Sequence, residues 1–166
     1  VEIEYIDNAF GSSNVYNRYI PDLDIEPIKD IYDTYISSTF PNTNYGRYTN
    51  LNVSNNGNDI CLIKSDLPSI PSESTIISCK LNYQYNFNEI SDNFIIVGAY
   101  EIMNSWDEYT VKWNDNISIS SNRQSYNYLY PTSTSVRQSY LTITELAKSW
   151  YDGSKLNNGV AIKSIA

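Results

Sequence analysis

Residues 76–85 read IISCKLNYQY, and from residue 79 onwards apolar or aromatic side chains alternate with polar ones. A period of two is the pattern of a half-buried β-strand, because successive side chains of a strand point to opposite faces. Similar short blocks recur along the chain, each bounded by clusters of Asn, Gly, Ser or Pro. This spacing is typical of a β-sandwich or barrel. About nine strands are predicted, near residues 2–6, 31–36, 48–54, 60–66, 76–85, 94–103, 108–113, 136–143 and 158–164.

The composition agrees with this pattern. The chain has 166 residues, enough for one domain with its own core, and 16 of them are tyrosine. Aromatic and β-branched residues favour pleated, half-buried strands. The predicted fold class is all-β: a jelly-roll-like antiparallel β-sandwich with one short C-terminal helix and an N-terminal strand extension. We expect residues 1–30 to form the extension and residues 31–166 to form the domain.

One helix is predicted near the C-terminus. Thr142 and Glu145 have the spacing of a capping box, Trp150 lies on the apolar face, and Gly153 follows as a stop signal. A helix this short is marginal in water, so Trp150 must pack against the sheets for it to persist. Residues 118–135 are polar and rich in tyrosine, and we interpret them as a surface loop packed by its own rings, with a hidden strand as the alternative.

Charge and composition exclude several classes of function. The formal net charge is −8, which disfavours binding to nucleic acid and to anionic membranes. No stretch approaches 18 apolar residues, so no membrane insertion is expected. The chain has no histidine, which rules out Ser-His-Asp and Cys-His arrangements. Asp107 and Glu108 are adjacent and would point to opposite faces of a strand, so they cannot flank one glycosidic bond. We expect no catalysis.

Cys61 and Cys79 lie on either side of a proline-rich connection. If the flanking strands form an antiparallel hairpin, the two thiols face each other within reach of a disulfide. The alternative is two buried free thiols in separate sheets. Both readings stay open from the sequence alone.

A calcium site is a weaker candidate. Carboxylate oxygens are the ligands that calcium prefers, and an acidic run lies near the N-terminus. A solvated acidic face explains the same residues without a metal, and no spacing of a known calcium loop is present. The residues concerned are Asp22, Asp24, Glu26, Asp30 and Asp33.

Alternating tyrosines form the most informative pattern. Rings two residues apart on a strand share one face. An exposed row of rings suits stacking on the faces of sugars, but it equally suits contact between protein subunits or packing beneath loops. Trp106 precedes a turn and could join such a surface or the core. The candidate platform residues are Tyr83, Tyr85, Trp106, Tyr126, Tyr128 and Tyr130.

Four segments resemble, in order, the DNRLRE domain family of secreted and cell-surface β-sandwich modules. The similar segments are DTYI at 33–36 with NYG at 44–46 and LNV at 51–53; LIKSDL at 62–67 with ISCKL at 77–81; WDEYTVKWN at 106–114; and ITELAKSW at 143–150 with NNGVAIK at 157–163. The resemblance spans about residues 33–163. It implies a jelly-roll-like sandwich, an absence of catalysis, and a role in surface attachment or carbohydrate binding outside the cell.

Two functions are consistent with these features. In the first, the chain is a non-catalytic structural or adhesive subunit of a cell-surface polymer or filament. Its alternating N-terminal strand, with Val1, Ile3 and Tyr5 on one face, would leave its own domain and add to the open sheet edge of another copy. Because the chain begins at Val1, we also expect processing before that residue. In the alternative, it is a carbohydrate-binding module that binds a polysaccharide through a tyrosine platform. Either function is expected outside the cell.

Overall fold

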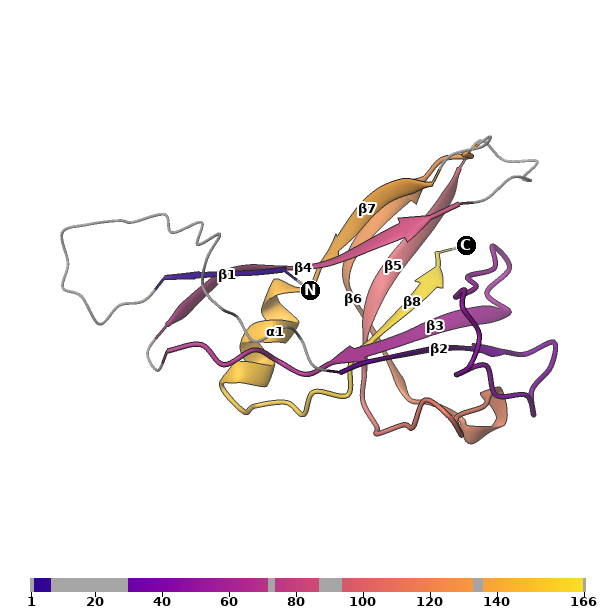
Figure 1. Cartoon of the computed structure of the whole chain (residues 1–166), viewed down its shortest axis with the longest axis horizontal. Helices are drawn as coiled ribbons and strands as arrows, with labels where there is room; N and C mark the ends of the chain where they lie inside the picture. Colours follow the sequence, from indigo (N-terminus) through magenta and orange to yellow (C-terminus); the bar gives the residue numbers. More distant parts are fainter. Residues whose placement is uncertain (1, 7–29, 72–73, 87–93, 133–135, 166) are drawn as a thin grey trace.

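The computed structural model describes residues 2–6, 30–71, 74–86, 94–132 and 136–165. Nearly all regular structure in these ranges is β-strand, drawn as arrows in Figure 1. The elements in chain order are β1 (Glu2–Ile6), β2 (Ile31–Ser37), β3 (Asp59–Ser65), β4 (Thr75–Tyr85), β5 (Ile95–Ile102), the 3-10 helix η1 (Trp113–Asp115), β6 (Ile119–Leu129), β7 (Arg137–Thr142), α1 (Thr144–Tyr151) and β8 (Val160–Ser164).

The strands form two antiparallel sheets. One has three strands in the order β1-β4-β7, and the other has five in the order β2-β3-β8-β5-β6. Contacts between β6 and β7 join the two sheets at one side of the sandwich. The all-β antiparallel sandwich with one short helix, predicted from the alternating pattern, is confirmed.

The main core lies between the two sheets. The register of the five-stranded sheet aligns four residues in one row across β2, β3, β8 and β5: Tyr35, Cys61, Ile162 and Ala99. All four are buried, as are the residues that the three-stranded sheet and α1 contribute from the facing side: Cys79, Leu81, Leu141, Leu146 and Ala147. Each fully buried leucine contributes on the order of 2 kcal/mol through removal of its side chain from water.

In the described part of the chain, the other face of the five-stranded sheet is covered at the end where β5 runs into the connection to β6. Leu62, Tyr100 and Ile102 point to this face and are buried beneath the connection from β5 to β6, which also supplies Val111 and Trp106. Both faces of β5 and β8 are therefore buried there, which explains why these strands read as continuous apolar runs. Among the described residues, Tyr126 and Tyr128 near the C-terminus of β6 on the same face are exposed.

Two predicted strands and one predicted loop are corrected. Residues 48–54 and 108–113 contain no strand, and a turn in the second segment is fixed by the Asp107 carboxylate, which accepts a hydrogen bond from the Tyr109 N–H. Conversely, β6 occupies most of residues 118–135, where a surface loop was expected. Its polar residues at inward positions concealed the strand, because the hydrophobic period is weak there.

Helix α1 begins one residue later than the capping-box pattern predicts, with Ile143 and not Thr142 as its N-cap residue. Thr142 ends β7, and the N-cap residue Ile143 makes no side-chain capping bond. The Thr144 hydroxyl instead accepts a hydrogen bond of 3.0 Å from the Cys79 N–H and so ties the helix to β4. After the helix, Gly153 adopts a φ of 75°, the left-handed conformation expected of a stop residue.

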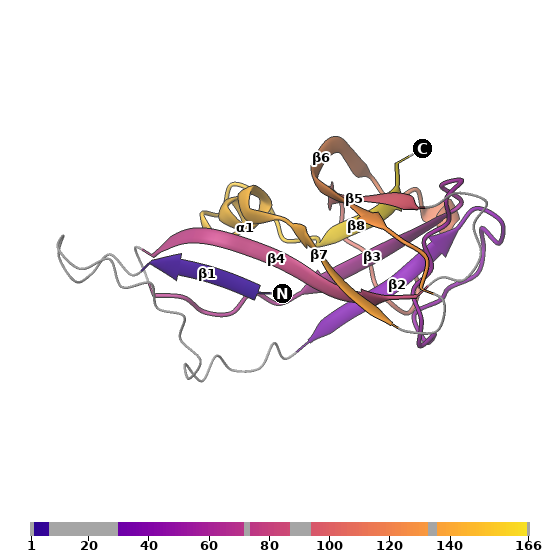
Figure 2. The ribbon, with the colours of Figure 1, turned by 90° about the horizontal axis from the view of Figure 1, so that it is seen from above.

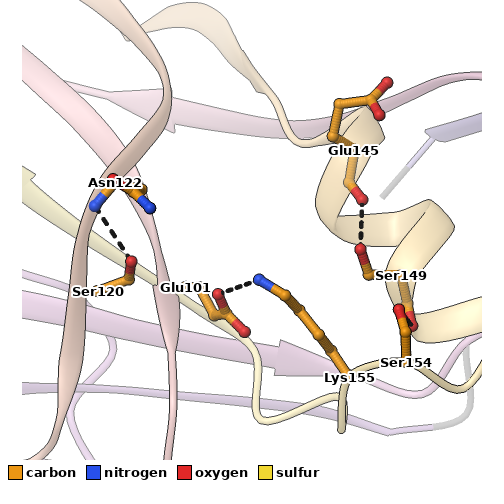
Figure 3. Close-up of polar contacts among 7 residues, drawn as sticks. All are labelled: Glu101, Ser120, Asn122, Glu145, Ser149, Ser154 and Lys155. Carbon is orange, nitrogen blue, oxygen red and sulfur yellow. Dashed lines mark hydrogen bonds and ion pairs between the residues drawn. The ribbon is translucent and has the colours of Figure 1, made fainter.

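Polar contacts hold the helix and the segment that follows it (Figure 3). The Ser149 hydroxyl donates to the Glu145 carbonyl one turn earlier, at 3.0 Å. Beyond the helix, the Lys155 ammonium pairs with the Glu101 carboxylate of β5. An ion pair at a partly exposed position contributes at most about 1 kcal/mol. Its main effect is to fix the approach to β8.

The N-terminal strand does not leave its own domain. β1 pairs with β4 of the same chain, with Ile3 opposite Cys79, and Figure 2 shows the two strands side by side. Ile3 packs against the main core. This corrects the expectation that residues 1–6 add to another copy; a covalently tethered strand meets its own sheet edge at high effective concentration. Val1 lies outside the described residues.

The two cysteines are free thiols. Cys61 belongs to β3 of the five-stranded sheet, whereas Cys79 belongs to β4 of the three-stranded sheet. The flanking strands do not pair, so the hairpin required for the predicted disulfide does not form. The disulfide prediction is wrong, and the alternative of two buried thiols in separate sheets describes the structure.

Candidate functional site

Exposed rings gather along the outer face of β6. Tyr126 and Tyr128 alternate on the strand and are 51% and 41% exposed, and Tyr130, immediately after the strand, is 49% exposed. Leu129 between them points inward and is buried. Because β6 is the edge strand of its sheet, these rings lie at a border of the molecule.

A fourth ring completes the group. Phe94 stands directly before β5 and is 40% exposed. Its ring centroid lies 5.1 Å from that of Tyr128 and 6.1 Å from that of Tyr130, while the Tyr126 and Tyr128 centroids are 5.9 Å apart. Phe94, Tyr126, Tyr128 and Tyr130 are hereafter called the β6 aromatic row. Rings in mutual contact restrict one another's rotamers, so the row is partly preorganised.

The rings of the row are not coplanar. The planes of Tyr126 and Tyr128 meet at 71°, and those of Phe94 and Tyr128 meet at 74°. These edge-to-face arrangements are favoured by the quadrupoles of aromatic rings. The row therefore offers ring faces in several directions, with angular notches between them, and not one flat surface.

A glycine beside the row leaves space on the adjoining surface of the sheet, because it has no side chain. Gly98 pairs with Tyr126 on one side and with Lys163 on the other. A Cβ atom at Gly98 would lie 2.9 Å from a Tyr100 ring carbon and 3.0 Å from Arg123 Cδ. The missing side chain thus lets Tyr100 and Arg123 lie across the sheet.

Two cationic side chains stand next to these rings. The Arg123 guanidinium carbon lies 4.6 Å from the centroid of Tyr126, and Lys163 Nζ lies 4.5 Å from the centroid of Tyr100. Both distances are within the range of cation–π attraction. The Arg123 guanidinium therefore supplies hydrogen-bond donors beside the aromatic row, and Lys163 supplies further donors two strands away, beyond Gly98. The face combines apolar ring surfaces with polar groups that can bind hydroxyl oxygens.

Tyr83 and Tyr85 share a face, but it is the inner one. Both rings are partly buried and pack against the main core, with their centroids 6.3 Å apart. Burial raises the pKa of the Tyr83 hydroxyl. The structure therefore removes this pair from the predicted platform, because its rings fill the space between the sheets.

Trp106 also belongs to a core. Its indole N–H donates to the Asn158 carbonyl at 2.8 Å, and its ring packs against the cluster behind the five-stranded sheet. It lines a small surface cavity of about 420 Å³ in the connection between β5 and β6. The connection that carries Trp106 leads into the start of β6, where Ile119 pairs with Ile102 of β5. The aromatic row lies at the opposite end of β6, so Trp106 does not belong to it.

Sequence reasoning missed Phe94, Tyr100, Arg123 and Lys163. Their contribution depends on the register of β5 with β6 and β8, which the hydrophobic pattern does not specify. Phe94 alone had a usable signal, since a large ring directly before a buried strand often covers the end of a sheet. The three alternating tyrosines of residues 126–130 were the only part of the row visible in the sequence.

The acidic residues proposed for calcium are only partly covered by the structure. Asp22, Asp24 and Glu26 lie outside the described residues. Burial raises the pKa of the Asp33 carboxyl at its position on β2. Within the described ranges, no three acidic or cysteine side chains gather as a metal site would require. Calcium binding stays a prediction.

In the described part of the chain, no helix has the length and apolar character needed to cross a membrane.

Comparison with known proteins assigns the family. A search of curated proteins found no match. The model of carbohydrate-binding module family 96 matches residues 25–164, which covers both sheets except β1. The DNRLRE likeness rests on the same part of the chain and remains a resemblance. With most of its length matched, the chain belongs to carbohydrate-binding module family 96.

Proposed function

We propose that this chain is a non-catalytic carbohydrate-binding module that binds a polysaccharide through the β6 aromatic row. The observation that carries the proposal is the row itself: four exposed rings in mutual contact on one face of a family 96 module. Clusters of exposed apolar rings are uncommon on the surface of a monomeric protein and mark binding sites.

The chemistry of the row suits sugars. The C–H faces of a sugar ring pack against aromatic faces, and each aromatic side chain offers a large apolar area at low cost in conformational entropy. The tyrosine hydroxyls and the Arg123 guanidinium, 4.6 Å from the Tyr126 centroid, supply donors for sugar hydroxyls at the rim. Apolar contact then provides affinity, and the polar rim provides orientation.

The angles within the row favour one class of ligand. A crystalline polysaccharide presents a flat surface and requires coplanar rings, whereas the row has planes that meet at 71° and 74°. A single, soluble polysaccharide chain can turn its sugar units to follow such faces. Outward residues of a strand repeat at roughly 6.7 Å, so the three tyrosines extend over about 13 Å and span several sugar units. We therefore propose a soluble chain as the ligand.

The filament hypothesis has less support. Its central requirement was an N-terminal strand given to another copy, and β1 pairs instead with β4 of its own chain. Membership of a carbohydrate-binding family supports the alternative reading directly. We also propose an extracellular or cell-surface location, because polysaccharides accessible to such modules lie outside the cell.

The proposal is tested by titration calorimetry against soluble xylan, galactomannan, mixed-linkage glucan and polygalacturonate. The variant Tyr126→Ala/Tyr128→Ala should bind the preferred polysaccharide about 100-fold more weakly. Tyr109→Ala is the matched control, because Tyr109 is an exposed tyrosine in the β5–β6 connection, outside the row. Unchanged affinity of the double variant would refute the role of the row, and absence of binding to every polysaccharide, soluble or crystalline, would refute the function.

A further inference from the structure

A groove of about 600 Å³ crosses the outer face of the three-stranded sheet, over β4 and β7. Its lining comes from three consecutive residues of each strand: Asn82, Tyr83 and Gln84, and Gln138, Ser139 and Tyr140. The groove lies beyond the part of β4 that pairs with β1, because the β1 register ends at Lys80.

Strand pairing explains the shape of this groove. Asn82 lies opposite Tyr140, and Gln84 lies opposite Gln138. These four side chains are exposed, whereas Leu81 and Leu141 at alternate positions are buried in the core. The outward side chains thus form the walls, and the backbone between them forms the floor.

The walls combine an aromatic face with amides. The Tyr140 ring is 50% exposed, and Lys80 Nζ lies 5.5 Å from its centroid. Gln84 and Gln138 face each other across the strand pair, and each primary amide carries two N–H donors and a carbonyl acceptor. A pair of such amides can donate to and accept from neighbouring sugar hydroxyls while the ring packs on a C–H face.

We propose that this groove, hereafter the β4–β7 groove, is a second saccharide-binding site. The proposal rests on the proposed function, since it uses the same class of ligand. The groove differs from the aromatic row in chemistry: it has one ring and several amides, where the row has four rings. It therefore binds more weakly and discriminates more strongly by hydroxyl pattern.

The two sites lie on opposite sides of the sandwich. The inward-facing Asn127 of β6 donates from Nδ2 to the Ser139 hydroxyl of β7 at 2.8 Å, so these two strands meet through their inner faces. The row projects from the outer face of the five-stranded sheet, and the groove lies on the outer face of the three-stranded sheet. One module can therefore hold two polysaccharide chains at once and link them.

Calorimetry with cellohexaose, xylohexaose, mannohexaose and trigalacturonate measures the number of sites. The wild-type chain should bind two equivalents of the preferred oligosaccharide. The variant Gln84→Ala/Gln138→Ala/Tyr140→Ala should bind one equivalent with the affinity of the row. Tyr126→Ala/Tyr128→Ala should retain the weaker equivalent. Thr142→Ala, an exposed residue further along β7, is the control and should keep both.

The outcomes separate the two proposals. If the wild-type chain binds only one equivalent, and the groove variant binds that equivalent with the same affinity, the second site would be overturned and the row would stand. Binding to none of the oligosaccharides or polysaccharides would overturn both. Because the substituted residues are solvent-exposed, the variants should unfold within about 4 °C of the wild-type temperature, and this is checked by circular dichroism. A linking role further predicts that wild-type protein raises the viscosity of the preferred polysaccharide, whereas either variant does not.

Discussion

Two tyrosine pairs with the same spacing end up in opposite environments. Tyr83 and Tyr85 on β4 are partly buried against the core, whereas Tyr126 and Tyr128 on β6 are exposed at an outer face. In both strands the rings share a face, as an alternation of two requires. Alternation therefore identifies residues that act together, but it does not say whether they face the core or the solvent.

The residues between the rings decide the outcome. On β4 the alternate positions, which face away from the rings, carry Lys80, Asn82 and Gln84; these side chains are costly to bury, so the tyrosine face turns inward. On β6 the intervening Leu129 is buried and Asn127 bonds to β7, so the tyrosine face turns outward. Burial at the alternate positions is thus as informative as the rings themselves.

The largest expected effect is on stability. Tyr83→Ala/Tyr85→Ala should lower the free energy of unfolding by about 4 kcal/mol, because two partly buried rings leave cavities behind. Tyr126→Ala/Tyr128→Ala should lower it by less than about 1 kcal/mol, since surface substitutions remove little packing. Urea unfolding followed by circular dichroism measures both values. Equal losses of unfolding free energy for the two pairs would contradict the placement of one pair against the core and the other at the surface.

Binding should show the reverse order. Tyr126→Ala/Tyr128→Ala should weaken polysaccharide binding by about 100-fold, equivalent to about 2.7 kcal/mol, because both rings are taken from the centre of the row. Tyr85→Phe keeps its ring against the core and should bind with wild-type affinity. Calorimetry on the folded proteins gives both affinities. A loss of affinity in the Tyr85 variant that matches the loss in the double variant would show that the site lies on the inner face and not on the β6 aromatic row.

The thiol of Cys79 reports on the inner face of β4. Burial raises the pKa of this thiol to about 11, so little of the reactive thiolate exists at pH 8. Labelling with a thiol reagent at that pH should be at least about 100-fold slower than for an exposed cysteine. Both cysteines should react after denaturation without a reductant. Labelling of only denatured, reduced protein would instead reveal a disulfide.

The smallest expected effect concerns the rim of the row. Arg123→Ala removes the guanidinium that lies 4.6 Å from the Tyr126 centroid and should weaken binding by about threefold, since such a donor is solvent-exposed. Lys112→Ala, a cation in the β5–β6 connection, serves as its control. Competition binding at constant salt resolves a difference of this size. A loss of affinity as large as that of the Tyr126→Ala/Tyr128→Ala variant would show that the Arg123 charge, and not the aromatic rings, contributes most to binding.

Much of the fold could be predicted from the sequence because alternation is strong where one face is apolar. The strands predicted at 76–85 and 31–36 differ from β4 and β2 by one residue each. The strand β6 was missed because Ser125 and Asn127 occupy its inward positions and give no hydrophobic period. The strand expected at 108–113 is absent because the Asp107 carboxylate accepts a hydrogen bond from the Tyr109 N–H and fixes a turn there. This local bond outweighs the preference of a short alternating segment for a strand.

The candidate site was predictable only in part. Tyr126, Tyr128 and Tyr130 could be grouped from their spacing, but Phe94 and Arg123 join them only through the pairing of β5 with β6. Pairing register across distant strands depends on tertiary packing, which a local pattern does not encode. The same limit explains Cys61 and Cys79, whose flanking strands are consecutive in the chain yet lie in different sheets.

The central claim is that sugar rings pack on the β6 aromatic row. The most direct test is an NMR spectrum of the complex between tyrosine-ring-labelled protein and the preferred hexasaccharide, read for nuclear Overhauser effects between protein and sugar. The structure predicts contacts from sugar C–H protons to the rings of Tyr126, Tyr128 and Tyr130, and none to the rings of Tyr83 and Tyr85. A saturated complex without contacts to the first three rings would contradict it.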